Sequence, residues 1–295
     1  MFKILQGDCR ERLKELPEES VQCCMTSPPY WHLRDYECED QIGNDPTPEE
    51  YATSLATTFS AVHRVLKSDG VLFLNLGDTY CGGGGYCPTA PSNRKGSKQS
   101  TNRGAKVGAR PVPDGYKAKD LVGFPWLMAF ELRKAGWYLR ADIIWEKTNC
   151  MPENVTDRPT RSHEYVFLFS KSSKYHYDHE AVKEETSKGK KRNCRTVWQI
   201  PKAQSKTVHT AVFPESLVER CVLAGSKKGD TVLDPFAGSG TTGVVSLRLG
   251  RDFIGVEANS EYYKICNERI KEAAGTAQRL LETATATTTP DDATS

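Results

Sequence analysis

The chain has 295 residues, of which 38% are hydrophobic and 26% are charged, and its formal net charge is +2. This length allows one substantial α/β core, while the apolar runs are far too short to cross a bilayer and no signal-peptide core follows the N-terminus. The ten cysteines include no CxxC pair, which argues against a zinc site or a thioredoxin-like motif. We therefore expect a soluble, cytoplasmic protein with reduced thiols that binds neither a metal nor a membrane.

Seven short apolar runs alternate with helical patterns along the chain. The predicted strands are residues 2–6, 21–26, 71–76, 139–145, 165–170, 231–233 and 252–256. A capping box with Pro48 at the first helical position predicts a helix from Thr47 to about Leu66. Further helices are predicted at residues 125–134, 214–224 and 260 to about 274. This alternation predicts an α/β fold with one doubly wound, mostly parallel, seven-stranded sheet.

The second predicted strand runs directly into the sequence Ser27-Pro28-Pro29-Tyr30. The two prolines stiffen the turn and remove two N–H donors. An exocyclic amine of cytosine or adenine has two N–H donors and is a poor nucleophile, because its lone pair is delocalised into the ring. Ser27 Oγ and the Pro28 carbonyl can accept the two hydrogen bonds, and Tyr30 can stack on a base that has left the duplex. The predicted catalytic residues are Ser27, Pro28, Pro29 and Tyr30.

Two basic segments interrupt the apolar pattern. Residues 82–119 are rich in Gly, Ser and Pro and contain eight basic residues against one acid, which predicts a long mobile insert. The second basic segment spans about residues 171–206. Two basic loops on a nearly neutral body favour a polyanionic partner such as nucleic acid. The predicted nucleic-acid-binding residues in these segments are Arg94, Lys95, Arg103, Lys190, Lys191, Arg192 and Arg195.

A glycine-rich turn follows the predicted strand at residues 231–233 and opens a helix. Its glycines let the backbone approach a ligand, and the helix N-terminus offers free N–H groups. Asp234 disfavours a pyrophosphate and favours the ammonium and sulfonium groups of S-adenosylmethionine. Glu257, at the end of the next strand, is placed to accept hydrogen bonds from ribose hydroxyls. The predicted cofactor residues here are Asp234, Phe236, Gly238, Gly240, Thr241, Thr242 and Glu257.

The sequences Thr26-Ser27-Pro28-Pro29-Tyr30 and Asp234-Pro235-Phe236-Ala237-Gly238-Ser239-Gly240-Thr241-Thr242-Gly243 resemble the two signatures of the N4-cytosine/N6-adenine DNA methyltransferases. Their order, with the target signature first, resembles the beta group of that family. The resemblance spans residues 2 to about 270. It implies S-adenosylmethionine as cofactor, double-stranded DNA as partner and direct methyl transfer to a flipped base.

Further segments resemble the family more loosely. Asp8 lies in a segment that resembles the one whose Asp contacts the cofactor adenine, and Phe213, with His209, resembles the segment that closes over the methionine end. Residues 145–147 and 156–165 are similar to segments on the target-base side, and 171–206 is where this group has its target-recognition region. The predicted organisation is a single methyltransferase domain at 1–273, followed by a disordered tail at 274–295 with a threonine-rich run.

Several alternatives stay open. Ser27 stands where adenine enzymes of the family more often have Asp or Asn, so N4 of cytosine is favoured over N6 of adenine. C5-cytosine chemistry is rejected, because the chain has no Pro-Cys dipeptide. An NAD-dependent oxidoreductase is a distant alternative that leaves the Ser27–Tyr30 turn unexplained, and intact motifs argue against a catalytically silent DNA-binding protein. The resemblance implies a nucleoid-associated protein of a bacterium or phage, and leaves open a homodimer and a partner restriction endonuclease.

Overall fold

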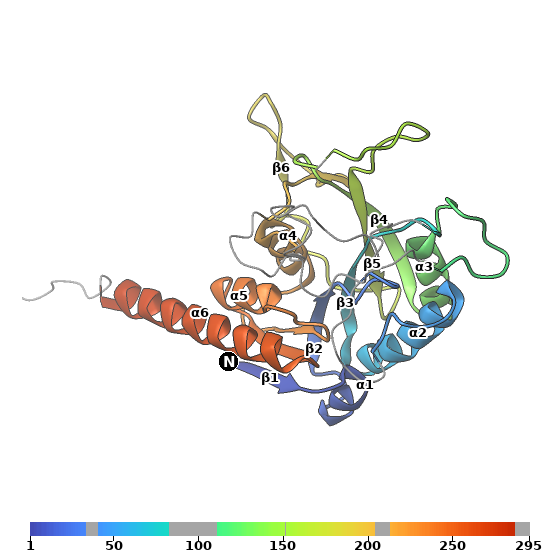
Figure 1. The fold of residues 1–295 in the computed structure, drawn as a ribbon. Coiled ribbons are helices and arrows are strands. Elements are labelled where there is room, and N and C mark those ends of the chain that lie inside the picture. The colour runs from blue at the N-terminus through green and yellow to red at the C-terminus, as the bar shows by residue number, and fades with distance from the viewer. Residues whose placement is uncertain (34–40, 83–110, 151, 204–212, 287–295) are drawn as a thin grey trace, which may run out of the picture.

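A computed structural model describes residues 1–33, 41–82, 111–150, 152–203 and 213–286 of the chain (Figure 1). One eight-stranded sheet forms its centre, in the order β1-β10-β9-β2-β3-β5-β4-β8. The strands of this sheet are β1 (Phe2–Gln6), β2 (Val21–Thr26), β3 (Leu66–Leu76), β4 (Tyr138–Glu146), β5 (His163–Ser170), β8 (Val197–Gln199), β9 (Thr231–Asp234) and β10 (Asp252–Glu257). A separate short hairpin pairs β6 (Glu184–Glu185) with β7 (Lys191–Arg192).

The sheet is mostly parallel, as the sequence predicts. Strands β1, β10, β9, β2 and β3 are mutually parallel, β5 is antiparallel to both β3 and β4, and β4 is parallel to β8. All seven predicted strands are present, but the predicted number of strands is wrong by one, because β8 extends the sheet. This strand has three residues, of which only Trp198 is buried. Such a short strand has too few residues for a recognisable alternation.

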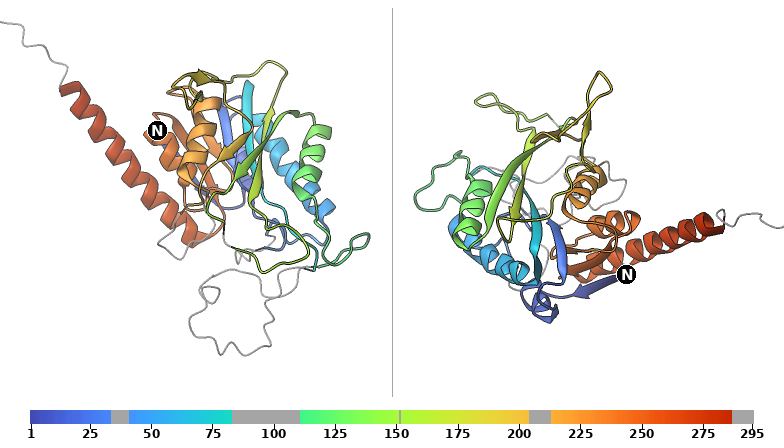
Figure 2. Two further views of the ribbon diagram at one scale, coloured as in Figure 1. Left: turned by 90° about the horizontal axis from the view of Figure 1, so that it is seen from above. Right: turned by 180° about the vertical axis from the view of Figure 1, so that it is seen from behind.

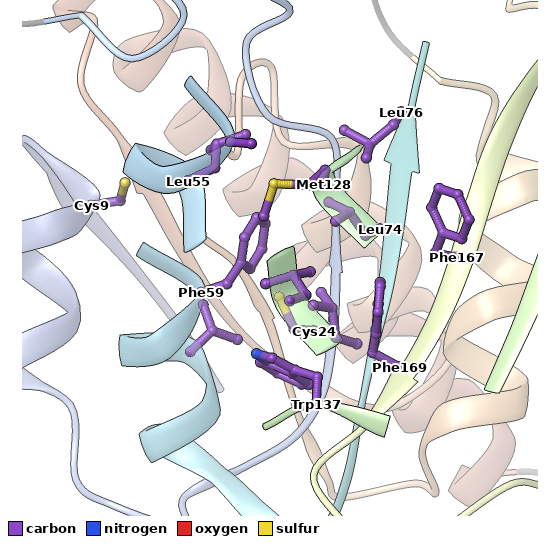
Figure 3. Packing of buried hydrophobic residues seen from close by; sticks show 14 of the residues in the cluster. Cys9, Cys24, Leu55, Phe59, Leu74, Leu76, Met128, Trp137, Phe167 and Phe169 are labelled. Atoms are coloured by element: carbon purple, nitrogen blue, oxygen red, sulfur yellow. The ribbon is translucent and has the colours of Figure 1, made fainter. Parts of the chain in front are cut away.

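Helices cover both faces of the sheet (Figures 1 and 2). The helices are α1 (Cys9–Arg12), the 3-10 turn η1 (Leu13–Glu15), α2 (Pro48–Val65), α3 (Phe124–Lys134), α4 (Glu215–Gly225), α5 (Thr241–Arg248) and α6 (Ser260–Ala286). Side chains that alternate along a strand point to opposite faces. In β3, Leu72 and Leu74 join the core under α2 and α3 (Figure 3), whereas Val71 and Phe73 join the core under α4, α5 and α6.

The ends of two helices test the sequence predictions directly. The capping box of α2 is formed, since Thr47 Oγ1 accepts from the Glu50 N–H at 3.2 Å and the Glu50 carboxylate accepts from the Thr47 N–H. Helix α6 begins at Ser260 as predicted but continues to Ala286, so residues 274–286 are helical and the predicted start of the tail is wrong. Ala, Gln, Arg, Leu and Glu at 277–282 favour a helix, and this propensity prevails over the threonine-rich run.

The basic insert and the C-terminal tail are both predicted to be mobile or disordered. Residues 83–110 of the basic insert, and residues 287–295 of the predicted tail, lie outside the described residues. The far part of α6 projects away from the sheet (Figure 2). None of the described helices is long and apolar enough to cross a membrane.

Candidate active site

The two predicted signatures meet at the carboxyl ends of neighbouring strands. Strands β2 and β9 are parallel, with Cys24 opposite Leu233, so the residues that follow them emerge side by side. A hydrogen bond joins the two signatures, because Thr26 Oγ1 donates to Asp234 Oδ1 at 2.6 Å. The sequence therefore places the target signature and the cofactor loop correctly at one edge of the sheet.

Asp234 ends β9 and anchors the glycine-rich loop between β9 and α5, here called the glycine loop. Its side chain is almost fully buried, and its two carboxylate oxygens accept from the hydroxyls of Thr26 and Thr242 and from the N–H of Phe236. Burial raises the pKa of Asp234 to about 6, although these three hydrogen bonds act to lower it. We expected this carboxylate to meet a cationic ligand directly, but the structure turns it inward. Thr242 likewise points to Asp234, at 2.7 Å, and is fully buried.

The glycines of the loop have different tasks. Gly238 has a φ of +52°, and a Cβ there would meet only the Phe236 carbonyl oxygen, at 3.9 Å, within its surroundings. The backbone at Gly238 therefore faces space that a ligand can enter. Gly240 has a φ of +83°, but a Cβ at this position would lie 2.9 Å from Cys266 Sγ of α6. Gly240 thus allows helix packing rather than an open approach to a ligand.

Two residues beside these glycines complete the loop. Thr241 is the first residue of α5, and its hydroxyl oxygen is buried without a hydrogen-bond partner among the described residues. Since buried polar groups are normally paired, this hydroxyl fits a site that a ligand completes. Arg269 of α6 donates to the Ser239 carbonyl at 2.6 Å and to its hydroxyl at 2.9 Å, and so fixes the loop. No local sequence pattern points to Arg269, because it lies on a distant helix.

Glu257 ends β10 beside this loop. Its two oxygens accept from the N–H groups of Gly238 and Asn259, each at 2.8 Å. Burial raises the pKa of the Glu257 carboxyl to about 7, while these backbone hydrogen bonds act to lower it. A carboxylate oxygen has more than one acceptor site, so both oxygens can still accept from a ribose hydroxyl.

Asp8 stands at the end of the neighbouring strand, since the Gly7 N–H donates to the Glu257 carbonyl at 2.9 Å. The Asp8 carboxylate caps α1 through the Arg10 N–H at 2.7 Å and pairs with the Arg10 guanidinium. Burial alone would raise the Asp8 pKa, but the hydrogen bonds and charge of Arg10 outweigh it and lower the pKa. Asp8 is therefore held as an anion next to Glu257, on the side where the adenosine part of the cofactor is expected.

The two aromatic residues predicted to bind the cofactor, Phe236 and Phe213, lie on different parts of the structure. Phe236 belongs to the glycine loop and its ring meets Phe59 of α2 edge-on, with 6.5 Å between ring centroids. Phe213 precedes α4 and packs, half-buried, against the core cluster that contains Ala237 of the loop. His209, which the resemblance groups with Phe213, lies outside the described residues.

The Ser27–Tyr30 turn of the target signature is held by residues of α2 and β5. The Tyr51 hydroxyl of α2 donates to the Pro29 carbonyl, and Pro28 is buried. The Tyr30 hydroxyl donates to Glu164 Oε2 of β5 at 2.8 Å, and it also lies 3.4 Å from Ser27 Oγ. Ser27 and Tyr30 remain partly accessible, as a contact with a substrate requires.

Glu164 is the centre of a polar cluster that residue-by-residue reasoning from the sequence missed. It accepts from Asn75 Nδ2 of β3 at 3.1 Å and forms an ion pair with Lys147, which follows β4. The side chains of Glu164 and Lys147 are only 16% and 17% exposed, so this ion pair is largely shielded from water. The resemblance placed both segments on the target-base side only in general terms; the structure brings Glu164 into contact with Tyr30.

The predicted DNA-binding residues are distributed unevenly. Arg94, Lys95 and Arg103 lie outside the described residues. In the β6–β7 region, the side chains of Lys190 and Lys191 are exposed, whereas Arg192 and Arg195 contact Glu184 at 3.3 Å and 3.6 Å. Arg220 of α4 approaches the same carboxylate at 3.7 Å. Glu184 thus gathers three guanidinium groups into one basic cluster with a fixed arrangement.

Metal chemistry is not indicated by the described part of the chain, which contains no group of three or more His, Cys, Asp and Glu side chains suited to hold an ion. The features present are instead a ligand loop with two buried carboxylates and a serine–tyrosine turn. Together they can hold a nucleoside-containing cofactor beside an acceptor group. If the cofactor already carries a good leaving group, no side-chain acid or base is required to activate it, and the site acts mainly by positioning.

Comparisons with known proteins agree with this arrangement. A family model described as DNA methylase, for N6/N4 methyltransferases, matches residues 21–268. Over 271 residues the chain is 50% identical to the type II methyltransferase M.SmaI of Serratia marcescens, which covers 91% of this chain and 90% of that protein. M.Cfr9I of Citrobacter freundii is 47% identical over 270 residues, or 91% of this chain and 87% of that protein.

Solved structures show the same fold. A protein described as a putative DNA modification methylase from Thermus thermophilus, complexed with S-adenosyl-L-methionine, matches with a TM-score of 0.62 and 26% identity over 93% of this chain and 95% of that chain. The PvuII DNA methyltransferase, described as cytosine-N4-specific, matches with a TM-score of 0.67 and 22% identity over 95% of this chain and 93% of that chain.

Proposed function

Because the chain belongs to the N6/N4 family of DNA methylases and is a type II, S-adenosylmethionine-dependent DNA methyltransferase, we propose that it methylates the N4 amine of cytosine. The alternatives of an NAD-dependent oxidoreductase and of a catalytically silent DNA-binding protein are thereby set aside. The observation that supports the choice of cytosine is Ser27, a neutral hydroxyl at the end of β2 where adenine enzymes more often have Asp or Asn.

The hydrogen-bond pattern around Ser27 suits a target amine. Tyr30 has one hydroxyl hydrogen and gives it to Glu164, which as a carboxylate can only accept. The contact between Ser27 Oγ and Tyr30 Oη therefore uses the hydrogen of Ser27, and the Ser27 lone pairs remain available. An N–H of the N4 amine can donate to one of them, and the Pro28 carbonyl is the proposed acceptor for the second N–H.

The cofactor supplies an electrophilic methyl group on a positively charged sulfonium. The residues that would hold it are those of the loop after β9 and the strand ends beside it: the backbone at Gly238, the Thr241 hydroxyl, the Glu257 carboxylate for the ribose and Asp8 for the adenine side. Asp234 would act by fixing this loop, because its buried carboxylate accepts from the loop backbone at Phe236. The reaction then depends on holding the amine and the methyl group in line, which is catalysis by positioning.

The pKa values of five buried cysteines argue against covalent catalysis by these thiols. Burial raises the pKa of Cys9, Cys23 and Cys266 to about 12, and it raises the pKa of Cys24 and Cys221 well above the ordinary value of a thiol. A thiol with such a pKa is not a nucleophile at neutral pH, since the thiolate is the reactive form. This favours direct transfer to the amine of a base that has been turned out of the duplex.

Nucleoside analysis tests the proposal. The purified protein and S-adenosylmethionine with a deuterated methyl group are incubated with DNA from cells that lack this modification. The DNA is then digested to nucleosides, which are separated and identified by mass spectrometry. We expect N4-methyldeoxycytidine with a deuterated methyl group, and no other labelled deoxynucleoside. N6-methyldeoxyadenosine would overturn the choice of base but keep direct transfer, and 5-methyldeoxycytidine would overturn both.

A further inference from the structure

The polar cluster at Glu164 contains a chain of hydrogen bonds that has a fixed direction. Glu164 Oε2 accepts from Tyr30 and from Asn75, and Glu164 Oε1 pairs with Lys147. Every neighbour in this set is a donor, so a carboxylate is the group that satisfies all of them. The acceptor end of the chain is therefore at Glu164, and the hydroxyl of Tyr30 must point toward it.

The packing around Tyr30 fixes the ring as well as the hydroxyl. A Cβ added to Gly77, directly after β3, would lie 2.6 Å from Tyr30 Cε2 and 3.3 Å from Glu164 Cδ. The ring thus rests against bare backbone, with no room for a side chain at position 77. Burial, followed by the negative charge of Glu164, raises the pKa of Tyr30 well above 10, so the phenol keeps the proton that it donates.

We propose that Glu164 is a positioning residue for methyl transfer, which acts through the Tyr30 hydroxyl to turn Ser27 into a hydrogen-bond acceptor for the target amine. With Glu164 in place, Tyr30 donates toward Glu164 and Ser27 donates toward Tyr30. Ser27 then presents lone pairs, rather than its hydrogen, to the incoming amine. The Ser27 oxygen, as the negative end of the O–H dipole, then faces the amine as the amine gains positive charge in the transition state.

Lys147 and Asn75 have a supporting part in this arrangement. Lys147 balances the buried charge of Glu164, which would otherwise be costly to keep ionised. Asn75 donates to Glu164 and also to the Tyr165 carbonyl at 3.0 Å, so it ties the carboxylate to β5. A glutamine at position 164 cannot serve both sides, because its NH2 group would face either Lys147 or the donors Tyr30 and Asn75.

This inference rests on the proposed function in one respect, namely that Ser27 receives the target amine. A double-mutant cycle tests it with Glu164→Gln, Tyr30→Phe and the double variant, while Glu131→Gln, on the surface of α3, is the matched control. Incorporation of tritiated methyl groups into unmodified DNA gives kcat and the KM for DNA, and calorimetry gives the affinity for S-adenosylhomocysteine. Counting methyl groups is independent of which base receives them, so the cycle remains readable even if the nucleoside analysis finds adenine.

We expect each single substitution to lower kcat by roughly 10- to 100-fold, because each removes or misdirects a hydrogen bond to a charged group. The affinity for S-adenosylhomocysteine and the KM for DNA should stay within about threefold of wild type, since the aromatic ring remains in Tyr30→Phe. The double variant should be no slower than the slower single variant, within about threefold, because both changes break the same chain.

Three results would overturn the proposal. The first is a double variant whose fold-decrease in kcat equals the product of the two single decreases. This result would mean that Glu164 acts by a route other than Tyr30. The second is a Glu164→Gln enzyme as fast as Glu131→Gln. The third is an equal fall of kcat and cofactor affinity in both single variants, which would reveal a purely structural role; Tyr30→Phe keeps this test valid should Glu164→Gln not fold.

Discussion

The cofactor side and the target side of the site are built in different ways. On the cofactor side, the carboxylates of Asp234 and Glu257 are held by groups within a short stretch of chain, above all the N–H groups of Phe236, Gly238 and Asn259. On the target side, Ser27 and Tyr30 are held by side chains that lie far away in the sequence, such as Glu164, which is 134 residues from Tyr30. The first side is mainly a local motif, to which Thr26 of β2 adds one distant hydrogen bond, whereas the second side exists only in the folded sheet.

Substitutions on the two sides should therefore have different effects. Breaking the cofactor side should disturb the loop itself, because its carboxylates are structural acceptors for buried donors. Breaking the target side should leave the loop intact and remove only the alignment of the amine. The expected effects on stability, cofactor binding and DNA affinity decrease in that order.

Asp234→Ala should cause the greatest loss. The Thr26 hydroxyl, the Thr242 hydroxyl and the Phe236 N–H would all lose their acceptor inside the core. We expect the free energy of unfolding to fall by at least about 3 kcal/mol, since each buried unsatisfied donor costs about 1–3 kcal/mol. Thermal denaturation should show a melting temperature lower by at least roughly 6 °C.

Asp157→Ala is the matched control for this loss. Asp157 is 57% exposed and pairs with Lys119 on the surface, so its removal should change the melting temperature little. If Asp234→Ala melted at the same temperature as Asp157→Ala, the inward-facing carboxylate would not be an anchor of the loop.

Glu257 should make cofactor binding depend on pH. Its pKa is raised to about 7 by burial, whereas ribose hydroxyls would donate to its ionised form. Binding of S-adenosylhomocysteine, measured by calorimetry, should therefore strengthen by up to about tenfold between pH 6 and pH 8. For the free protein the sign is opposite: the stability that comes from a protonated, buried Glu257 is lost as the pH rises through about 7.

Glu257→Gln separates this effect from other titrations. The variant should bind more weakly at pH 8 and lose most of the pH dependence, whereas Glu261→Gln, in the first turn of α6, should keep it. A pH dependence that is unchanged in Glu257→Gln would assign the titration to another group.

The smallest predicted effect concerns DNA affinity. Lys190 and Lys191 are exposed, whereas Arg192 and Arg195 are partly neutralised by Glu184. Replacing both lysines with Ala should reduce the slope of log affinity against log salt by about 0.9 for each phosphate that a lysine no longer neutralises. Fluorescence anisotropy with labelled duplex DNA over a range of salt concentrations measures this slope.

A second double variant tests whether the location of the charge matters. Lys14→Ala with Lys134→Ala removes the same charge from two helical segments, where both lysines form ion pairs with glutamates. Its slope should stay at the wild-type value. An equal change of slope in both double variants would remove the β6–β7 region from the DNA interface.

The same contrast between local and distant contacts explains what the sequence could predict. The strands next to the signatures, the capping box at Thr47 and the meeting of the two signatures follow from local patterns and from the rule that parallel strands end at one edge. The inward turn of Asp234 was not predictable, because it depends on Thr26 of another strand. Glu164 lay within a segment that resembles the family, but only the pairing of β5 with β3 shows that it reaches Tyr30.

The most direct measurement of the central claim is a comparison of Ser27→Ala with Asp234→Asn, which keeps the size of the buried side chain. Calorimetry gives the affinity of each variant for S-adenosylhomocysteine, and tritiated methyl transfer gives the turnover. We predict that Ser27→Ala binds the ligand within about twofold of wild type but turns over roughly 100-fold more slowly, because it loses an interaction made mainly in the transition state. Asp234→Asn should lose ligand affinity. A Ser27→Ala variant that loses as much ligand affinity as Asp234→Asn would contradict the separation of the site into two sides.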